Sequence, residues 1–321
     1  MKNHIVFFSG GLSSFAVAHH LKLNYPSDNI VLYFTDTLWE DEDLYRFIDE
    51  ASNKMKLPLL KHSTGIDPVQ LMIKQHIIFN SRMGNCSSVL KMKVANDFLK
   101  KGITPPVESW INKQYLKTDN FVEDATLYFG ITFDEFHRTR AISENWAPFP
   151  TEFPLCKTYL DYDELLALYG ISKPRMYING FTHNNCKGRC VKAGKGHYKL
   201  LYNEDRKTFD EIKTIEWLLS KYVAVYHAVR KWKDGDYYDQ QIYLMSEHLL
   251  VENEQEMIRW HDSHYVYKPN LHFLGEDMDL HYPSIIKGTS LRSIKQGDAK
   301  NFKLDLFSEE IGGCGCFVEY A

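Results

Sequence analysis

The stretch that decides the fold is Phe8-Ser9-Gly10-Gly11-Leu12-Ser13-Ser14. A compact apolar run over residues 2–8 leads into it, and apolar residues at helical spacing over residues 15–21 follow it. This order predicts a strand, a tight glycine turn and a helix. Consecutive glycines let backbone N–H groups converge on an anion, and a helix start adds the positive end of its dipole. The stretch is a candidate phosphate-binding loop, although a plain strand-to-helix turn with a serine cap has the same pattern.

Predicted strands and helices alternate in the first part of the chain. Strands are predicted over residues 2–8, 29–35, 57–61, 125–131 and 175–181. After the helix that begins at the glycine turn, further helices are predicted over residues 41–55, 68–79, 87–101 and 162–169. This alternation predicts an α/β fold with a parallel five-stranded sheet and helices on both faces. Right-handed crossovers bring the carboxyl ends of the strands to one edge, where ligands of such folds bind.

Beyond residue 199 the pattern becomes mostly helical. Helices are predicted over residues 209–232, 239–251 and 254–260. A chain of 321 residues is long enough for one large or two modest domains. We expect a nucleotide-binding domain over residues 1–205 and a helical C-terminal region over residues 206–321.

Composition limits the classes of partner. The formal net charge is −4, which argues against a basic surface spread over the whole molecule, so any contact with nucleic acid has to be local. No run approaches the roughly 20 apolar residues that cross a bilayer, so no membrane span is expected. The apolar start is too short for the core of a signal peptide, and the cytoplasm is the expected compartment.

The loop resembles the PP-loop, whose usual form is Ser-Gly-Gly-x-Asp-Ser. That family includes ATP pyrophosphatases, phosphoadenosine phosphosulfate (PAPS) reductases and enzymes that thiolate tRNA and DNA. The resemblance implies an adenine nucleotide alpha hydrolase-like fold that binds ATP or a related adenine nucleotide, with Mg²⁺. The implied phosphate ligands are Ser9, Gly10, Gly11, Ser13 and Ser14. Serine at position 13 replaces the usual aspartate and removes one anionic side chain beside the phosphates.

Further segments resemble the PAPS reductase-like branch, in the same order along the chain. They are residues 33–37, 128–138 and 179–186. The resemblance implies that Asp36 and Thr37 lie near the ribose or a Mg²⁺ ion, and that Asp36, Glu135 and Arg138 are catalytic. A guanidinium such as that of Arg138 suits phosphate or sulfate because it is a planar fork of donors. A strand-end cap and a surface helix start are the alternative interpretations of Asp36 and Glu135.

Four of the six cysteines form two close pairs, Cys186-x3-Cys190 and Cys314-x-Cys316. Four thiolates suit tetrahedral Zn²⁺ or an iron–sulfur cluster, so these four are candidate metal ligands. Two alternatives stay open: ordinary thiols, or a redox-active tail pair that resembles the C-terminal catalytic cysteine of PAPS reductases. The Glu-Cys-Gly-x-His tail of those reductases is absent. Cys86 is a candidate fifth ligand or sulfur carrier.

Basic residues crowd into the segment Lys187–Lys199, which includes Lys192. In a chain with a net negative charge, this local basicity indicates an anionic partner, either nucleotide phosphates or a nucleic-acid backbone. A solvated loop is the alternative. Lys192 is the candidate nucleotide ligand of this segment.

These features favour an enzyme. The first hypothesis is an ATP-dependent transferase that activates an acceptor by adenylation and delivers sulfur or another group to a nucleic acid or nucleotide. Sulfonucleotide reduction and hydrolysis of an adenine nucleotide are the other enzymatic alternatives. The fourth hypothesis is a non-catalytic module that senses a nucleotide or binds a partner. A second copy of the chain, forming a homo-oligomer, is a further candidate partner.

Overall fold

The computed structural model describes residues 1–233, 240–271, 282–286 and 290–294. They fall into two compact units. The first unit contains Met1–Ile66 and Asn85–Cys190, and the second contains Asp67–Gly84 and the described residues from Val191 onward. A domain boundary between residues 205 and 206 stays a prediction.

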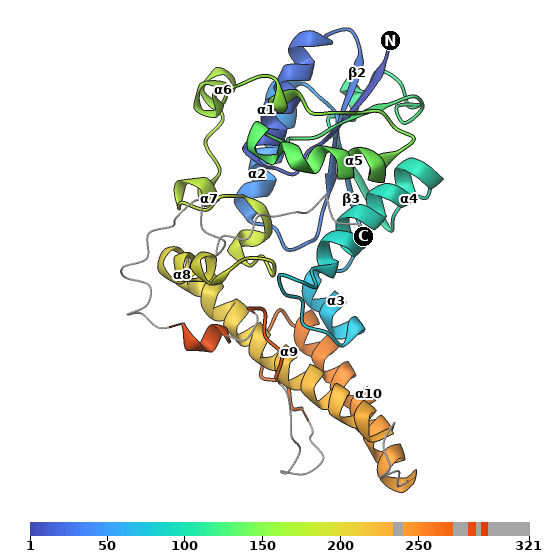
Figure 1. The fold of residues 1–321 in the computed structure, drawn as a ribbon, viewed down its shortest axis with the longest axis vertical. Coiled ribbons are helices and arrows are strands. Elements are labelled where there is room, and N and C mark those ends of the chain that lie inside the picture. Colours follow the sequence, from blue (N-terminus) through green and yellow to red (C-terminus); the bar gives the residue numbers. More distant parts are fainter. Residues whose placement is uncertain (234–239, 272–281, 287–289, 295–321) are drawn as a thin grey trace. The chain divides into compact units, whose positions relative to one another are not determined.

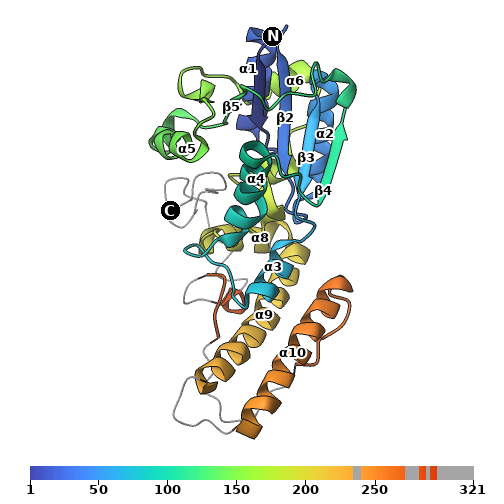
Figure 2. The same ribbon diagram turned by 90° about the vertical axis from the view of Figure 1, so that its right-hand side faces the viewer.

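The first unit is built on a six-stranded sheet with the order β4-β3-β2-β1-β5-β6 (Figures 1 and 2). The strands are β1 Asn3–Phe7, β2 Asn29–Thr35, β3 Leu59–Ser63, β4 Val107–Ile111, β5 Thr126–Tyr128 and β6 Thr151–Glu152. All neighbours pair in parallel except β3 and β4, which are antiparallel. The α/β class and a mostly parallel sheet are thus confirmed, with six strands in place of the five predicted.

The segment predicted as a fifth strand, residues 175–181, is not in the sheet. It forms the short helix α7, Arg175–Ile178, after Pro174. Proline fixes a backbone angle that suits the start of a helix, and Gly180, at φ +84, lies just beyond its end. The strand position beside β5 is taken by β6, which is only two residues long and carries no apolar signal.

Helices cover both faces of the sheet (Figure 2). On one face, α1 Leu12–Asn24, α2 Glu42–Met55 and α6 Tyr162–Tyr169 share a core with Val6 and Phe8. On the other face, α4 Lys93–Lys101 and α5 Thr139–Trp146 share a core with Ile5 and Phe7. Successive residues of β1 therefore enter opposite cores, as the alternation of side chains along a strand requires. A π-helix, Cys86–Met92, leads directly into α4.

The second unit is helical. It consists of α3 Pro68–Gln75, α8 Lys195–Glu204, α9 Arg206–Lys233 and α10 Gln240–Asp262, with α9 packed against the other three. Helix α10 joins the two segments predicted separately over residues 239–251 and 254–260. The buried carboxylate of Glu216 accepts hydrogen bonds from the backbone N–H groups of Ile285 and Leu291 at 3.1 and 2.8 Å. Among the described helices, none has the length and apolar character needed to cross a membrane.

Candidate functional site

The loop between β1 and α1 has a backbone that glycine makes possible. Gly10 has φ +79, and a Cβ atom there would lie 2.8 Å from Cγ of Leu44. Gly11 is the N-cap of α1 and has no side chain with which to cap the helix. Helix N-termini with uncapped N–H groups bind anions. The loop therefore has the geometry of a phosphate site.

Gly130, just after β5, comes close to the same helix start. A Cβ atom at this position would lie 2.8 Å from the backbone nitrogen of Ser14. The Ser14 hydroxyl donates to the Gly11 carbonyl at 2.9 Å, and the Ser13 hydroxyl lies 3.0 Å from the hydroxyl of Tyr162. Glycine at position 130 thus lets its backbone approach the helix start more closely than any residue with a Cβ atom could.

Two residues from the late part of the first unit fix the loop from the other side. The side-chain amide of Asn184 donates to the Gly10 carbonyl at 3.1 Å, and the backbone N–H of Leu12 donates to the Tyr177 hydroxyl at 3.4 Å. Asn184 is 1% exposed, and its Oδ1 atom has no hydrogen-bond partner among the residues that the structure describes. A buried amide oxygen of this kind is an acceptor available to a ligand beside the loop.

Asp36 follows β2 at the carboxyl end of the sheet. Its Oδ1 atom accepts hydrogen bonds from the Leu38 backbone at 2.8 Å and from the Tyr45 hydroxyl at 2.7 Å. Burial raises the pKa of Asp36, although both hydrogen bonds favour the carboxylate and oppose this shift. Thr37 instead turns toward Glu40 and donates to its carboxylate at 3.0 Å. Asp36 is thus a largely buried carboxylate at the carboxyl end of β2, and its predicted place near a nucleotide cation stays a prediction.

A buried ion pair lies next to these residues. The ammonium of Lys91 is 3.3 Å from Oε1 of Glu40, and the two side chains are 4% and 0% exposed. Burial by itself would lower the pKa of Lys91, but the charge and hydrogen bond of Glu40, together with the charges of Cys186 and Cys86, outweigh burial and raise the pKa. Glu40 also accepts a hydrogen bond from the backbone N–H of Cys186. Cys186 and Lys187 both have left-handed backbone angles, with φ 60 and 50, so this contact holds a strained turn.

Comparison with protein families identifies the part of the chain that carries the loop. Residues 3–107 match the model of the phosphoadenosine phosphosulfate reductase domain. This part of the chain is a PAPS reductase family domain. It belongs to the adenine nucleotide alpha hydrolase-like superfamily, as the PP-loop resemblance implied. A comparison with curated proteins gave no match.

The matched PAPS reductase segment contains the phosphate loop, Asp36, Glu40 and Lys91. Glu135, Arg138 and the cysteine loop lie beyond it. The structure places Glu135 and Arg138 in a short 3-10 helix, Phe133–Arg138, after β5, where their side chains form an ion pair with each other. Their predicted catalytic role therefore stays a prediction, as does that of Asp36.

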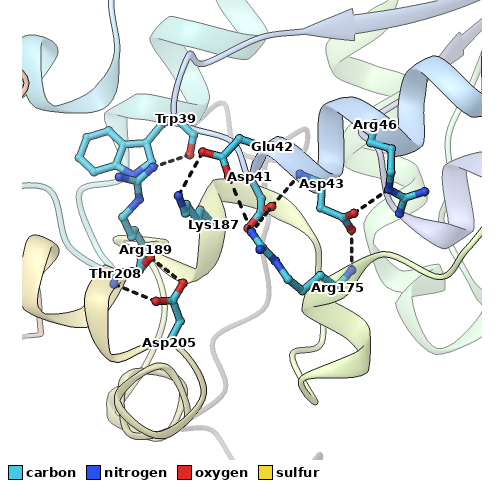
Figure 3. Close-up of polar contacts among 10 residues, drawn as sticks. All are labelled: Trp39, Asp41, Glu42, Asp43, Arg46, Arg175, Lys187, Arg189, Asp205 and Thr208. Atoms are coloured by element: carbon cyan, nitrogen blue, oxygen red, sulfur yellow. Dashed lines mark hydrogen bonds and ion pairs between the residues drawn. The ribbon is translucent and has the colours of Figure 1, made fainter.

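The acidic start of α2 holds the segment that follows α6 (Figure 3). Asp41 caps α2 through the Asp43 N–H and also accepts two hydrogen bonds from the Arg175 guanidinium, both at 2.7 Å. The Asp43 carboxylate accepts from the Arg175 backbone N–H at 2.6 Å and pairs with Arg46. These contacts join α7 to the PAPS reductase segment.

Part of the basic segment is also held by this acidic surface. Lys187 lies 3.4 Å from the carboxylate of Glu42, and Arg189 donates to the Trp39 carbonyl at 3.0 Å while its guanidinium lies over the Trp39 ring at 4.5 Å (Figure 3). Lys192 belongs to the second unit and is buried there. Its predicted contact with a nucleotide stays a prediction.

Of the two predicted cysteine pairs, the structure describes Cys186 and Cys190. The Cys186 thiol is hydrogen-bonded to Cys190, and this bond together with burial raises the pKa of Cys186 well above its usual range. Cys314 and Cys316 lie outside the described residues. Within the described part of the chain, no group of three or more His, Cys, Asp or Glu side chains is arranged to hold a metal ion. Cys186 and Cys190 alone do not make the four-thiolate set, so the metal assignment stays a prediction.

Three partners of the site had no signal in the sequence. Lys91 is close to Lys93 in the sequence, which is typical of the exposed basic face of a helix. Its burial against Glu40 comes from tertiary packing, which the sequence pattern does not show. Tyr162 contacts Ser13 across 149 residues of sequence, and Tyr177 contacts Leu12 across 165. A family alignment that tested pairs of positions for covariation is the kind of signal that finds such contacts.

Proposed function

We propose that this protein is an ATP-dependent enzyme that adenylates an acceptor and then transfers sulfur or another group to it, the acceptor being a nucleotide or a nucleic acid. The observation that carries the proposal is the phosphate loop: a helix start with glycine as its N-cap, a glycine-dependent turn and the close backbone approach that Gly130 allows. Its place in a PAPS reductase family domain supports an adenine nucleotide as ligand.

In this proposal the backbone N–H groups at the start of α1 hold the β- and γ-phosphates. Asp36 binds the Mg²⁺ ion, because Ser13 supplies no carboxylate and Glu40 is already engaged by Lys91. An oxygen of the acceptor attacks the α-phosphorus, the bond to the bridging oxygen breaks, and pyrophosphate leaves with that electron pair. Arg138 neutralises charge on the phosphates, with Glu135 orienting it.

The cysteines and the basic segment have supporting roles in the proposal. Cys186 and Cys190, with Cys314 and Cys316, would hold an iron–sulfur cluster or Zn²⁺, and a cluster would supply the sulfur chemistry. Lys192 and the rest of Lys187–Lys199 would contact phosphates of the nucleotide or of a nucleic-acid acceptor. The expected compartment is the cytoplasm.

Sulfonucleotide reduction is the second candidate, and the family of the matched domain favours it. The same loop would bind the phosphosulfate, and a thiolate would attack the sulfur. The bond from sulfur to the bridging oxygen would break, the nucleoside bisphosphate would leave with that electron pair, and an S-sulfonate would stay on the thiol, from which a second thiol releases sulfite. The sequence offers the tail pair, Cys314 and Cys316, as the attacking thiols, but the Glu-Cys-Gly-x-His tail of the reductases is absent. We therefore place adenylation first.

One assay separates the candidates. The purified full chain is incubated with Mg²⁺ and ATP labelled at the α-phosphate, with and without total nucleic acid or nucleoside mixtures, and pyrophosphate and labelled acceptor are measured. A parallel reaction contains PAPS and a dithiol, and sulfite is measured. Pyrophosphate release that depends on an acceptor and is lost in Asp36→Asn supports adenylation, whereas sulfite release without it supports reduction. Absence of ATP binding in a calorimetric titration would exclude the first proposal.

A further inference from the structure

A cavity of about 600 Å³ lies in the first unit, beside the phosphate loop. Its walls come from residues 132–134, which follow β5, from residues 155–163, which lead into α6, and from Lys173. Tyr162 is part of the lining, and its hydroxyl is 3.0 Å from the Ser13 hydroxyl of the loop. The cavity is thus one hydrogen bond away from the place where a nucleotide phosphate would bind.

Two aromatic side chains of the lining are almost fully exposed. Phe133 is 77% exposed and Tyr159 is 87% exposed. Both rings line the same cavity, so they offer two apolar faces to a flat ligand that enters it. The flat faces of such rings stack on the flat faces of nucleobases, whatever the base.

The polar groups of the lining fit the edge of a base better than a phosphate chain. The Asp134 carboxylate accepts from the Thr132 hydroxyl at 2.6 Å and keeps further acceptor capacity. Lys173 is paired with Asp163 at 2.8 Å, while Lys157 adds an ammonium donor. Three aspartates and two lysines line the cavity, so the lining does not concentrate positive charge for a triphosphate chain.

We propose that this cavity is the acceptor site and that it takes a nucleobase, stacked on Phe133 or Tyr159 with its edge toward Asp134 and Lys157. The proposal rests on the proposed function, since it names the acceptor of the adenylation. The base comes either from a free nucleotide or from a single strand of nucleic acid. In both cases the Tyr162–Ser13 contact sets the acceptor next to the nucleotide held by the loop.

The test uses the full chain and two fluorescent probes, 2-aminopurine ribonucleoside monophosphate and a short single-stranded oligonucleotide that contains one 2-aminopurine. Stacking quenches the fluorescence of this base, so titration gives an affinity. Phe133→Ala and Tyr159→Ala are compared with Phe136→Ala, which lies in the same 3-10 helix, is 59% exposed and is outside the lining. Because these side chains are exposed, the variants are expected to fold.

We expect Phe133→Ala or Tyr159→Ala to weaken probe binding about tenfold, and Phe136→Ala to leave it unchanged. Quenching with both probes identifies the source as a nucleotide, and quenching with the oligonucleotide alone identifies it as a strand. The proposal is overturned if neither probe is quenched, or if all three variants bind the probe as tightly as the wild-type chain. Competition by ATP also overturns it, because the cavity would then hold the base of ATP itself.

ATP affinity is measured separately in the same three variants. Failure of the chain to bind ATP would refute the proposed function and not the base site, since probe binding needs no ATP. Unchanged ATP binding with weakened probe binding is the result that supports two distinct sites.

Discussion

Replacing Glu40 by glutamine removes the charge that balances a buried lysine. Lys91 is 3% exposed, and its ammonium lies 3.3 Å from the carboxylate of Glu40. Breaking a buried ion pair from one side costs about 3–5 kcal/mol, because the other charge is left without a partner. The lysine can instead lose its proton, which at pH 7 costs about 4.6 kcal/mol for an ordinary pKa of about 10.4. We expect Glu40→Gln to lose about 3–5 kcal/mol of the free energy of unfolding at pH 7.

The loss depends on pH with a definite sign. In Glu40→Gln, burial without a carboxylate lowers the pKa of Lys91 below its unfolded value. The folded state then binds fewer protons than the unfolded state, so stability rises with pH up to about pH 10.4. At pH 9 the cost of the neutral lysine is about 2 kcal/mol. The difference between wild type and variant should therefore shrink between pH 7 and pH 9.

The measurement is urea unfolding of the full chain at both pH values, followed by the fluorescence of tryptophans that include the buried Trp39. Lys91→Met is the matched control. It leaves Glu40 with the hydrogen bonds from Thr37 and from the Cys186 N–H, so it should cost less than Glu40→Gln. The double variant should be more stable than Glu40→Gln alone. A loss below about 1 kcal/mol, or a loss that does not change with pH, would refute the reasoning.

Three further predictions concern the loop, the cation ligand and the cysteines. Gly130→Ala places a Cβ atom 2.8 Å from the Ser14 nitrogen, so ATP should bind about tenfold more weakly by calorimetry, and an unchanged affinity would contradict the assigned phosphate site. Burial raises the pKa of Asp36, so its carboxylate destabilises the fold at neutral pH. Asp36→Asn should accordingly keep or raise the melting temperature while it abolishes Mg²⁺-dependent ATP binding, and a lower melting temperature would argue against this balance. If Cys186 is a metal ligand, Cys186→Ser should lose iron or zinc from protein purified without oxygen, with Cys156→Ser as control, and equal metal content in both variants would remove the assignment.

Local pattern in the sequence determined the elements that carry the phosphate loop. The apolar run of β1, the glycine pair and the helical spacing of α1 are all encoded within residues 2–21, and the structure has each of them. Helix α6 has the predicted bounds of residues 162–169, because Asp161 caps its start and Gly170 ends it. Signals of this kind are read from neighbours in the chain, so they need no knowledge of the fold.

Tertiary packing decided what surrounds the loop. Residues 175–181 carry enough apolar character for a strand, but Pro174 and the place of β6 beside β5 make them a helix and a turn. The sequence around Lys91 is typical of an exposed helix, and only the fold brings the π-helix Cys86–Met92 and the loop after β2 together, so that Lys91 meets Glu40. Gly130 looks like an ordinary turn residue until its backbone meets Ser14. These contacts join residues that are far apart in the sequence. Their energies depend on burial and on distances between atoms, and local sequence patterns contain neither.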